Sequence, residues 1–278
     1  MTAAPSGFQH APEHPSPPTL PPSWEWHLYP DEEAMSQAVA ARLAEGVRTK
    51  PDALIGLATG ISPKRSYELL VASARREPTR YARARWLKLD EWGGLAMDDP
   101  ATCEHFLRHL LLTPLAVPAE RYFGWESRPV DAAAECRRVA AWLAANGPID
   151  IQVLGLGKNG HLGFNEPAPQ LHPGPHVATL SSESLSHSML RQSRGRVAYG
   201  LTLGMDDILG ARHIFLLVSG ARKARQLRRL VTGEISPEFP ASLLRRHRGV
   251  VVFCDAAAAA LLPLPESPVS PSASPQPR

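Results

Sequence analysis

The 278-residue sequence has little cysteine and no long apolar segment. Its three cysteines, Cys103, Cys136 and Cys254, are too few and too scattered for a disulfide framework or a metal cage, so we expect free thiols in a reducing compartment. No apolar run reaches the roughly 18 residues that span a bilayer. Residues 1–30 also lack the basic and then apolar order of a signal peptide. These absences predict a cytoplasmic protein with no membrane partner.

Two common enzyme signatures are also missing. No serine lies in a G-x-S-x-G motif, which is typical of many hydrolases. His105 and His109 are four residues apart, but Glu104 precedes the first of them, so the zinc-protease pattern H-E-x-x-H is absent. We therefore expect no metal site.

Excess charge is absent as well, because the formal net charge is only +3. Basic residues cluster at 222–229 and 245–248, and such clusters can form a nucleic-acid surface. A solvated helix face is the commoner origin, and we expect no nucleic-acid partner. The content of 21% charged and 44% hydrophobic residues is ordinary for a globular protein and excludes wholesale disorder.

Proline is abundant only at the two ends. Of 28 prolines, seven lie in residues 1–22 and six in residues 263–278. These ends have almost no apolar periodicity and cannot bury enough surface to offset chain entropy. We predict disordered tails at 1–23 and 263–278, and one folded domain at 24–262.

Short apolar segments alternate with helical patterns through that domain. The strand predictions are 53–57, 86–89, 149–156, 213–218 and 250–254. The helix predictions are 31–50, 62–75, 102–112, 130–145, 221–231 and 241–246. This alternation predicts a single-domain α/β fold, Rossmann-like, with a mostly parallel sheet and helices on both faces. Ligands of such sheets bind beyond the carboxyl ends of the strands.

The first notable strand exit is Thr59-Gly60-Ile61-Ser62-Pro63. Glycine frees the backbone, and a helix that starts here, with Ser62 as its cap, presents unpaired N–H groups that suit a phosphate. An ordinary turn that binds nothing has the same composition. The segment is a candidate phosphate loop.

The second exit is Asp90-Glu91, directly after an apolar strand. Adjacent residues of an extended chain point to opposite sides, so only one carboxylate can face a cleft while the other supports the structure. A strand-end carboxylate in a cleft is a candidate general base. A helix cap or surface turn is the alternative.

The third exit is the glycine-rich segment 155–167, Gly-Leu-Gly-Lys-Asn-Gly-His-Leu-Gly-Phe-Asn-Glu-Pro. Its opening matches G-x-G-x-x-G, but the dinucleotide fingerprint also requires a helix that begins inside the motif. Four prolines from Pro167 to Pro175 prevent a long helix, and we reject nucleotide binding. What remains is a loop in which Glu166 can orient the imidazole of His161, the alternative being a structural histidine.

Taken together, these segments resemble the superfamily of glucosamine-6-phosphate deaminase and 6-phosphogluconolactonase. The matching segments follow the family's order and span most of the domain: 57–63, 88–92, 155–167, 201–211 and 218–224. Leu-Asp-Glu-Trp-Gly-Gly-Leu at 89–95, Gly-Lys-Asn-Gly-His at 157–161 and His-Ser-Met-Leu at 187–190 are most similar to the galactosamine-6-phosphate isomerase/deaminase branch.

The resemblance implies an aldose–ketose isomerisation that releases ammonia from a hexosamine 6-phosphate, either the glucosamine or the galactosamine epimer. His161 matches the histidine that assists ring opening, and Asp90 matches the aspartate that moves the C2 proton. Glu166 matches the carboxylate that holds the histidine. The loop Thr59, Gly60, Ile61 and Ser62, with Lys223, matches the phosphate site. Such proton transfers need no cofactor, the implied partner is a small sugar phosphate, and a homo-oligomer is compatible with the family.

Two positions depart from the glucosamine enzymes. Asn159, which we include among the candidate catalytic residues, stands where those enzymes have an aspartate. An amide carries no charge, so Glu166 is expected to carry more of the stabilisation of an imidazolium. Leu185 falls about where those enzymes have an arginine, with Arg191 and Arg194 as alternative replacements.

Two other functions are considered. A 6-phosphogluconolactonase would share the fold and the glycine-histidine loop, but Trp92 stands where the lactonases have arginine. A non-catalytic sugar-phosphate sensor would be expected to lose acid–base residues and to carry a DNA-binding module. The segment before Trp24 is too short and proline-rich for a helix-turn-helix, so the isomerising deaminase is favoured.

Overall fold

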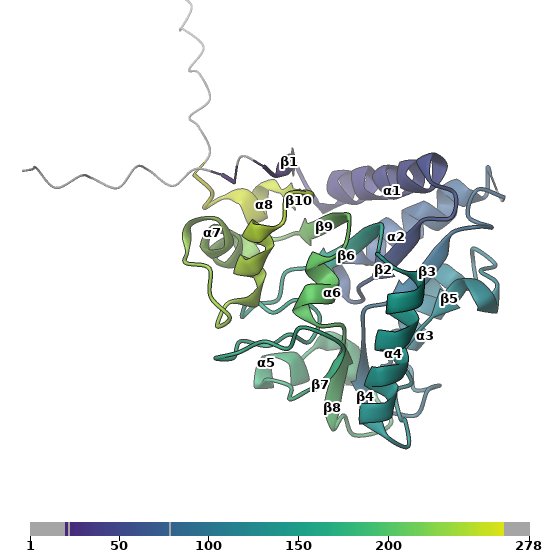
Figure 1. Cartoon of the computed structure of the whole chain (residues 1–278). Helices are drawn as coiled ribbons and strands as arrows, with labels where there is room; N and C mark the ends of the chain where they lie inside the picture. The colour runs from purple at the N-terminus through teal and green to yellow at the C-terminus, as the bar shows by residue number, and fades with distance from the viewer. Residues whose placement is uncertain (1–19, 22, 78, 264–278) are drawn as a thin grey trace, which may run out of the picture.

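A seven-stranded sheet runs through the computed structural model, which describes residues 20–263 except 22 and 78 (Figure 1). The predicted tails lie almost entirely outside the described residues. The sheet order is β1-β10-β9-β6-β2-β3-β5, and all neighbouring strands are parallel. The strands are β1 (Glu25–Tyr29), β2 (Leu54–Leu57), β3 (Arg85–Lys88), β5 (Tyr122–Phe123), β6 (Ile151–Gly155), β9 (His213–Val218) and β10 (Val250–Asp255).

The central strands are apolar on both faces because helices cover both. Leu54, Leu154 and Leu216 belong to one hydrophobic core, whereas their chain neighbours Ile55, Val153 and Leu217 belong to the other. Successive side chains of a strand point to opposite faces of the sheet. When helices cover both faces, both sets of side chains are buried, so apolar residues are favoured at every position. This is why the sequence shows continuous apolar runs at these strands.

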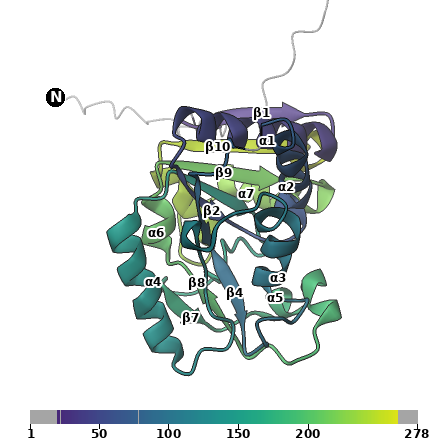
Figure 2. The same ribbon diagram turned by 90° about the vertical axis from the view of Figure 1, so that its right-hand side faces the viewer.

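The helices divide between these two cores, on opposite sides of the sheet (Figure 2). One core includes α1 (Glu32–Thr49), α2 (Ile61–Ala74), α3 (Cys103–Leu107) and the π-helical turn Arg108–Leu112. The other includes α4 (Ala132–Asn146), α6 (Met205–Leu209), α7 (Ala224–Thr232), α8 (Ala256–Ala259) and the 3-10 helix Pro240–Arg246. The predicted Rossmann-like α/β fold, with a mostly parallel sheet between helices, is confirmed.

A second, antiparallel sheet was not predicted from the sequence. It consists of β4 (Asp90–Gly93), β8 (Tyr199–Thr202) and β7 (His176–Ala178), in the order β4-β8-β7, and lies in the lower part of Figure 1. β4 begins two residues after β3 ends, and Asp90 pairs with Thr202 of β8. The chain therefore leaves the large sheet at the point where the candidate base stands.

The strand order reverses direction beside β2. From β2 the chain adds β3 and β5 on one side, and then returns to place β6 on the other side of β2. Connections on either side of such a switch point diverge and leave a crevice at the carboxyl ends of the strands. The segments that follow β2, β3, β6 and β9 all reach this edge. The first three are the strand exits that the sequence analysis singled out, and the fourth is the matching segment that contains Lys223. None of the helices in the described part of the chain is long and apolar enough to cross a membrane.

Candidate active site

Three segments converge on successive residues at the carboxyl end of β6. Oγ of Ser62 lies 3.7 Å from the position that a Cβ atom would take on Gly155. Nζ of Lys223 donates a 2.6 Å hydrogen bond to the carbonyl oxygen of Leu156. The ring of His161 packs over Gly157, where an added Cβ would lie 2.4 Å from its Cδ2 atom. The phosphate loop, the lysine and the histidine are therefore brought together.

The helix that follows the phosphate loop, α2, begins two residues earlier than predicted. Gly60, not Ser62, is the N-cap of α2, and its φ of +104° lies in a region that other residues rarely adopt. Ser62 therefore lies inside the first turn, so its prediction as the cap was wrong. The side chain of Ile61 is exposed, and the first N–H groups of a helix such as α2 have no partner within the helix.

Asp90 is buried, with 7% of its surface exposed. Its Oδ1 atom contacts Sγ of Cys103 at 3.8 Å, and that sulfur accepts a 3.1 Å hydrogen bond from Oγ1 of Thr59. Burial, and then the adjacent charge of Glu91, raise the pKa of Asp90 to about 7. A carboxyl group with this pKa can both accept and return a proton near neutral pH.

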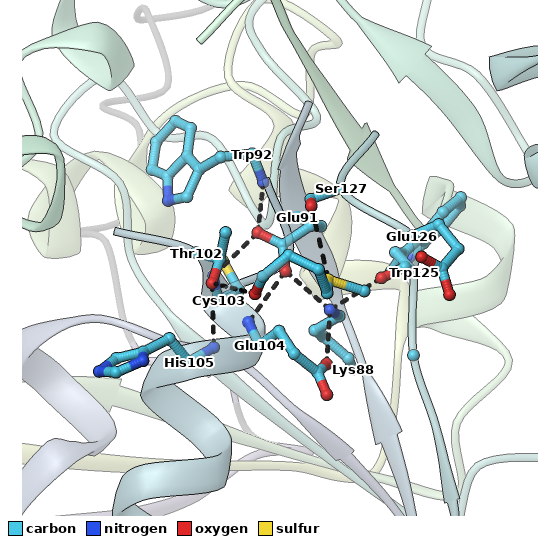
Figure 3. A network of polar contacts seen from close by, with 12 residues as sticks. Lys88, Glu91, Trp92, Thr102, Cys103, Glu104, His105, Trp125, Glu126 and Ser127 are labelled. Carbon is cyan, nitrogen blue, oxygen red and sulfur yellow. Dashed lines mark hydrogen bonds and ion pairs between the residues drawn. The ribbon is translucent and has the colours of Figure 1, made fainter. Parts of the chain in front are cut away.

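Glu91 supports the structure, which is the role that the sequence analysis expected of one of the two carboxylates. It is fully buried and accepts hydrogen bonds from the backbone N–H groups of Trp92, Cys103 and Glu104 (Figure 3). Its Oε2 atom also accepts a 2.7 Å hydrogen bond from Nζ of Lys88. Glu91 thus holds the first turn of α3 against β4.

His161 and Glu166 face each other across the glycine-rich loop. Nδ1 of His161 lies 3.5 Å from Oε2 of Glu166, an ion-pair distance rather than a close hydrogen bond. Asn159 joins the two residues: its Nδ2 donates to Oε2 of Glu166 at 2.7 Å, and its Oδ1 accepts from the backbone N–H of His161 at 3.1 Å. The amide therefore takes part in orienting the pair although it carries no charge.

Glu166 stays ionised because its second oxygen is also satisfied. The hydroxyls of Ser181 and Ser184 donate to its Oε1 atom. Burial opposes the charge, but His161 and the hydrogen bonds from Ser184 and Asn159 outweigh it and lower the pKa of Glu166 to about 2. A carboxylate that is permanently charged can hold and stabilise a protonated imidazole.

The loop also passes beside Asp90. Gly163 has a φ of +57°, and a Cβ atom on it would lie 3.5 Å from Oδ2 of Asp90 and 2.8 Å from Oγ1 of Thr202. Only glycine fits this close approach without strain. Asp90 from the β3 exit and the His161 loop from the β6 exit therefore share one site.

Three further residues of this region were not assigned a place by the sequence analysis. Cys103 was predicted only to be a free thiol, which it is, and its contact with Asp90 depends on how α3 packs. Nε2 of His187 lies 3.4 Å from the Cβ position of Gly60, and its ring centroid is 6.0 Å from that of Trp92. Lys158 forms a 2.8 Å ion pair with Glu183. His187 and Lys158 did lie within the segments that carry the resemblance, but residue type alone does not show where they point.

The remaining charges define the electrostatics of the site. Burial, and then the charges of His161, Lys223 and Lys158, lower the pKa of His187. Burial and Lys158 likewise lower the pKa of Lys223 to about 8. The side chains of Arg191 and Arg194, the two alternative phosphate partners, are exposed. Within residues 20–263, apart from 22 and 78, no three His, Cys, Asp or Glu side chains are grouped closely enough to hold a metal ion.

A family model described as glucosamine-6-phosphate isomerases/6-phosphogluconolactonase matches residues 30–253. The chain belongs to this family. Among its relatives, the chain is 38% identical over 218 residues to the provisionally named deaminase AgaI of Escherichia coli (strain K12), which covers 78% of the chain and 86% of the relative. It is 36% identical over 239 residues to glucosamine-6-phosphate deaminase 1 of Bacillus subtilis (strain 168). That match covers 83% of the chain and 96% of the relative.

Two solved structures are similar to this chain over most of its length. A monomeric glucosamine-6-phosphate deaminase superposes with a TM-score of 0.81 at 35% identity, over 85% of this chain and 99% of that one. The 6-phosphogluconolactonase of Trypanosoma brucei superposes with a TM-score of 0.68 at 19% identity, over 85% of this chain and 97% of that one. The second similarity shows a shared fold only.

Proposed function

We propose that this family member is an isomerising deaminase that converts a hexosamine 6-phosphate to a ketohexose 6-phosphate and ammonia. The observation that carries the proposal is the meeting of a buried carboxyl group of raised pKa, Asp90, with the His161–Glu166 pair at one edge of the sheet. Relatives at 35% identity or more that are named as deaminases support the same reaction.

The chemistry divides between the two acid–base groups. His161 moves a proton at the ring oxygen, which opens the sugar to its aldehyde, and Glu166 stabilises the charged imidazole. Asp90 then removes the proton from C2. The electron pair of that bond forms the C1–C2 double bond of an enolamine, while the pair of the C1=O double bond moves to O1, which takes up a proton from solvent. Return of the proton to C1 leaves an imine at C2, which water hydrolyses to the ketone and ammonia. A carboxyl group of pKa about 7 suits both halves of this transfer.

The phosphate is expected at the loop Thr59–Ser62, where the first N–H groups of α2 are free to bind it. Lys223 supplies a positive charge beside the end of β6. We assign the contact of the missing arginine to the neutral ring of His187, as a hydrogen-bond donor rather than a charge, because its Nε2 atom lies near Gly60 and its Nδ1 atom accepts from the backbone N–H of Met189. Arg191 and Arg194 are exposed. His187→Ala is expected to raise KM about tenfold with a smaller change in kcat, and Arg191→Ala to change neither. Equal effects of the two substitutions would contradict the assignment.

The galactosamine epimer is the expected substrate. Asn159 and Leu185 depart from the glucosamine enzymes, and the segments 89–95, 157–161 and 187–190 are most similar to the galactosamine branch. Purified protein incubated with galactosamine 6-phosphate and glucosamine 6-phosphate, with ammonia and ketose measured, tests both the reaction and the epimer. Release of ammonia from neither epimer would contradict the proposal.

A 6-phosphogluconolactonase is the alternative enzyme, and Trp92 disfavours it for the reason given above. Hydrolysis of 6-phosphogluconolactone without turnover of either amino sugar would favour it. Tight binding of sugar phosphates with no turnover would favour the non-catalytic sensor. We further propose a cytoplasmic enzyme that binds neither nucleic acid nor membranes. A homo-oligomer is compatible with this proposal, and light scattering of the purified protein tests it.

A further inference from the structure

A lysine is buried behind the candidate base. The side chain of Lys88 has no exposed surface, and its ammonium donates to Oε2 of Glu91 at 2.7 Å, Oε2 of Glu104 at 2.8 Å and the carbonyl oxygen of Trp125 at 2.9 Å (Figure 3). These three bonds use all its protons. Burying an ion is costly unless it is paired, and neither the proton transfers nor the phosphate site proposed above uses this one.

The geometry connects this lysine to Asp90. Lys88 ends β3, and Asp90 begins β4 two residues later. Glu91, which binds the ammonium, also accepts hydrogen bonds of 2.8 and 2.9 Å from the backbone N–H groups of Cys103 and Glu104. The thiol of Cys103 in turn contacts Oδ1 of Asp90. The same network therefore sets both the charge next to Asp90 and the position of α3 beside it.

Four titratable groups on the elements around Asp90 interact with its charge. Glu91 on β4 raises its pKa by charge, and Lys88 on β3 lowers it. Cys103 on α3 donates to the carboxylate, and the hydroxyl of Tyr67 on α2 remains protonated, because burial and the charge of Asp90 raise its pKa. Lys88 is thus the only cation among the groups that shift the pKa of Asp90 in the described part of the chain.

Glu104 is the outer end of the network. Its Oε1 atom accepts a 2.6 Å hydrogen bond from Nε of Arg108, whose side chain is 59% exposed. Glu104 and Arg108 both line a cavity of about 780 Å³ that lies apart from the candidate active site. The charge of Glu104 is therefore balanced by two cations, Lys88 and Arg108. The charge of Glu91 is balanced by Lys88 and by backbone N–H groups.

We propose that Lys88 is a positioning residue for Asp90: its ammonium compensates the carboxylate of Glu91, so that Asp90 can lose its proton near neutral pH, and it fixes α3 where Cys103 contacts Asp90. This inference rests on the proposed function, in which Asp90 is the base. It predicts that substitutions of Lys88 and of its second partner, Glu104, shift the pKa of Asp90 in opposite directions. Removing Lys88 makes ionisation of Asp90 harder, whereas removing the charge of Glu104 makes it easier.

The test is a direct titration of the Asp90 carboxyl carbon by NMR in aspartate-labelled protein, assigned from the spectrum of Asp90→Asn. Lys88→Met is expected to raise the titration midpoint by about one pH unit, the low end for the loss of a nearby opposite charge. Glu104→Gln is expected to lower it. Where turnover is present, the acid limb of kcat/KM moves in the same directions, which is about a tenfold loss below neutral pH for Lys88→Met.

The matched control is Lys50→Met. Lys50 forms a 2.7 Å ion pair with the buried Asp150, and neither shifts the pKa of Asp90. The same substitution there is expected to destabilise the fold and to leave the midpoint unchanged. If Lys88→Met does not fold, Glu104→Gln decides alone. An unchanged midpoint in folded Lys88→Met, or a shift of Glu104→Gln to higher pH, would overturn the inference. Because NMR needs no turnover, a wild type without deaminase activity refutes the proposed function without masking this result.

Discussion

The ring of His161 occupies the space that a side chain on Gly157 would need. A methyl group on Gly157 would lie 2.4 to 2.6 Å from three atoms of the ring, so the ring must move to admit it. Gly157→Ala is expected to reduce kcat by roughly 10²-fold or more, because general acid–base catalysis depends on the position of the group. Gly174→Ala, where the added methyl meets no atom within 4 Å, is the control. Equal activity of both variants would contradict the placement of His161.

Asp90 is expected to lower the stability of the fold at neutral pH. Its pKa rises from 3.8 in the unfolded chain to about 7 in the fold, so its favourable contribution is full below about pH 3.8 and is lost as the pH rises through 7. Asp90→Asn resembles the protonated acid in shape. The variant should therefore melt several degrees above the wild type at pH 8 and at nearly the same temperature at pH 4. Calorimetry at the two pH values measures the difference, and a variant that melts lower at pH 8 would contradict the burial of a carboxylate here.

Glu166 is expected to show the opposite dependence. Its pKa falls from 4.5 to about 2, so its contribution is present above pH 4.5 and is lost as the pH falls through 2. Glu166→Gln should lose up to roughly 3 kcal/mol of the free energy of unfolding at neutral pH, and the difference should shrink in acid. Denaturant unfolding from pH 7 to pH 3 measures it. Glu45→Gln, at an exposed position, is the control and should differ little from the wild type at any pH.

Lys223 is expected to make substrate capture fall in alkaline solution. Its pKa is lowered to about 8 by burial and by Lys158, so the free enzyme loses this charge as the pH rises through 8. Because the phosphate needs a cation, kcat/KM should fall above pH 8 in the wild type. It should stay nearly constant to pH 9.5 in Lys223→Arg, whose guanidinium remains protonated. The same alkaline fall in Lys223→Arg would assign it to another group.

The sequence predicted the parts of the fold in which local pattern and packing agree. The apolar runs at 53–57 and 213–218 became central strands because both of their faces are covered. β4 was not predicted because Asp-Glu-Trp-Gly shows no apolar alternation. The burial of its Glu91 depends on Lys88 and on three backbone N–H groups that bind the carboxylate. Likewise the start of α2 depends on the left-handed backbone of Gly60, which outweighs the capping preference of Ser62.

The candidate site could be predicted as a set of strand exits but not as a geometry. The division of roles between Asp90 and Glu91 was expected from the alternation of side chains along an extended chain. In the structure Glu91 binds Lys88 and backbone N–H groups, whereas Asp90 contacts the thiol of Cys103. The contact of Cys103 with Asp90 depends on how α3 packs against β4, and the approach of His187 to Gly60 depends on the fold of the segment that follows α5 (Ser182–Leu185). Contacts between residues far apart in the chain have no counterpart in local periodicity.

The central claim is that Asp90 moves the C2 proton of a hexosamine 6-phosphate. The most direct measurement is the rate of ammonia and ketose formation from galactosamine 6-phosphate by the wild type and by Asp90→Asn, with folding of both checked by circular dichroism. The account predicts equal amounts of the two products from the wild type and a kcat lower by roughly 10²–10⁴-fold in the folded variant. Turnover by Asp90→Asn at the rate of the wild type would contradict it.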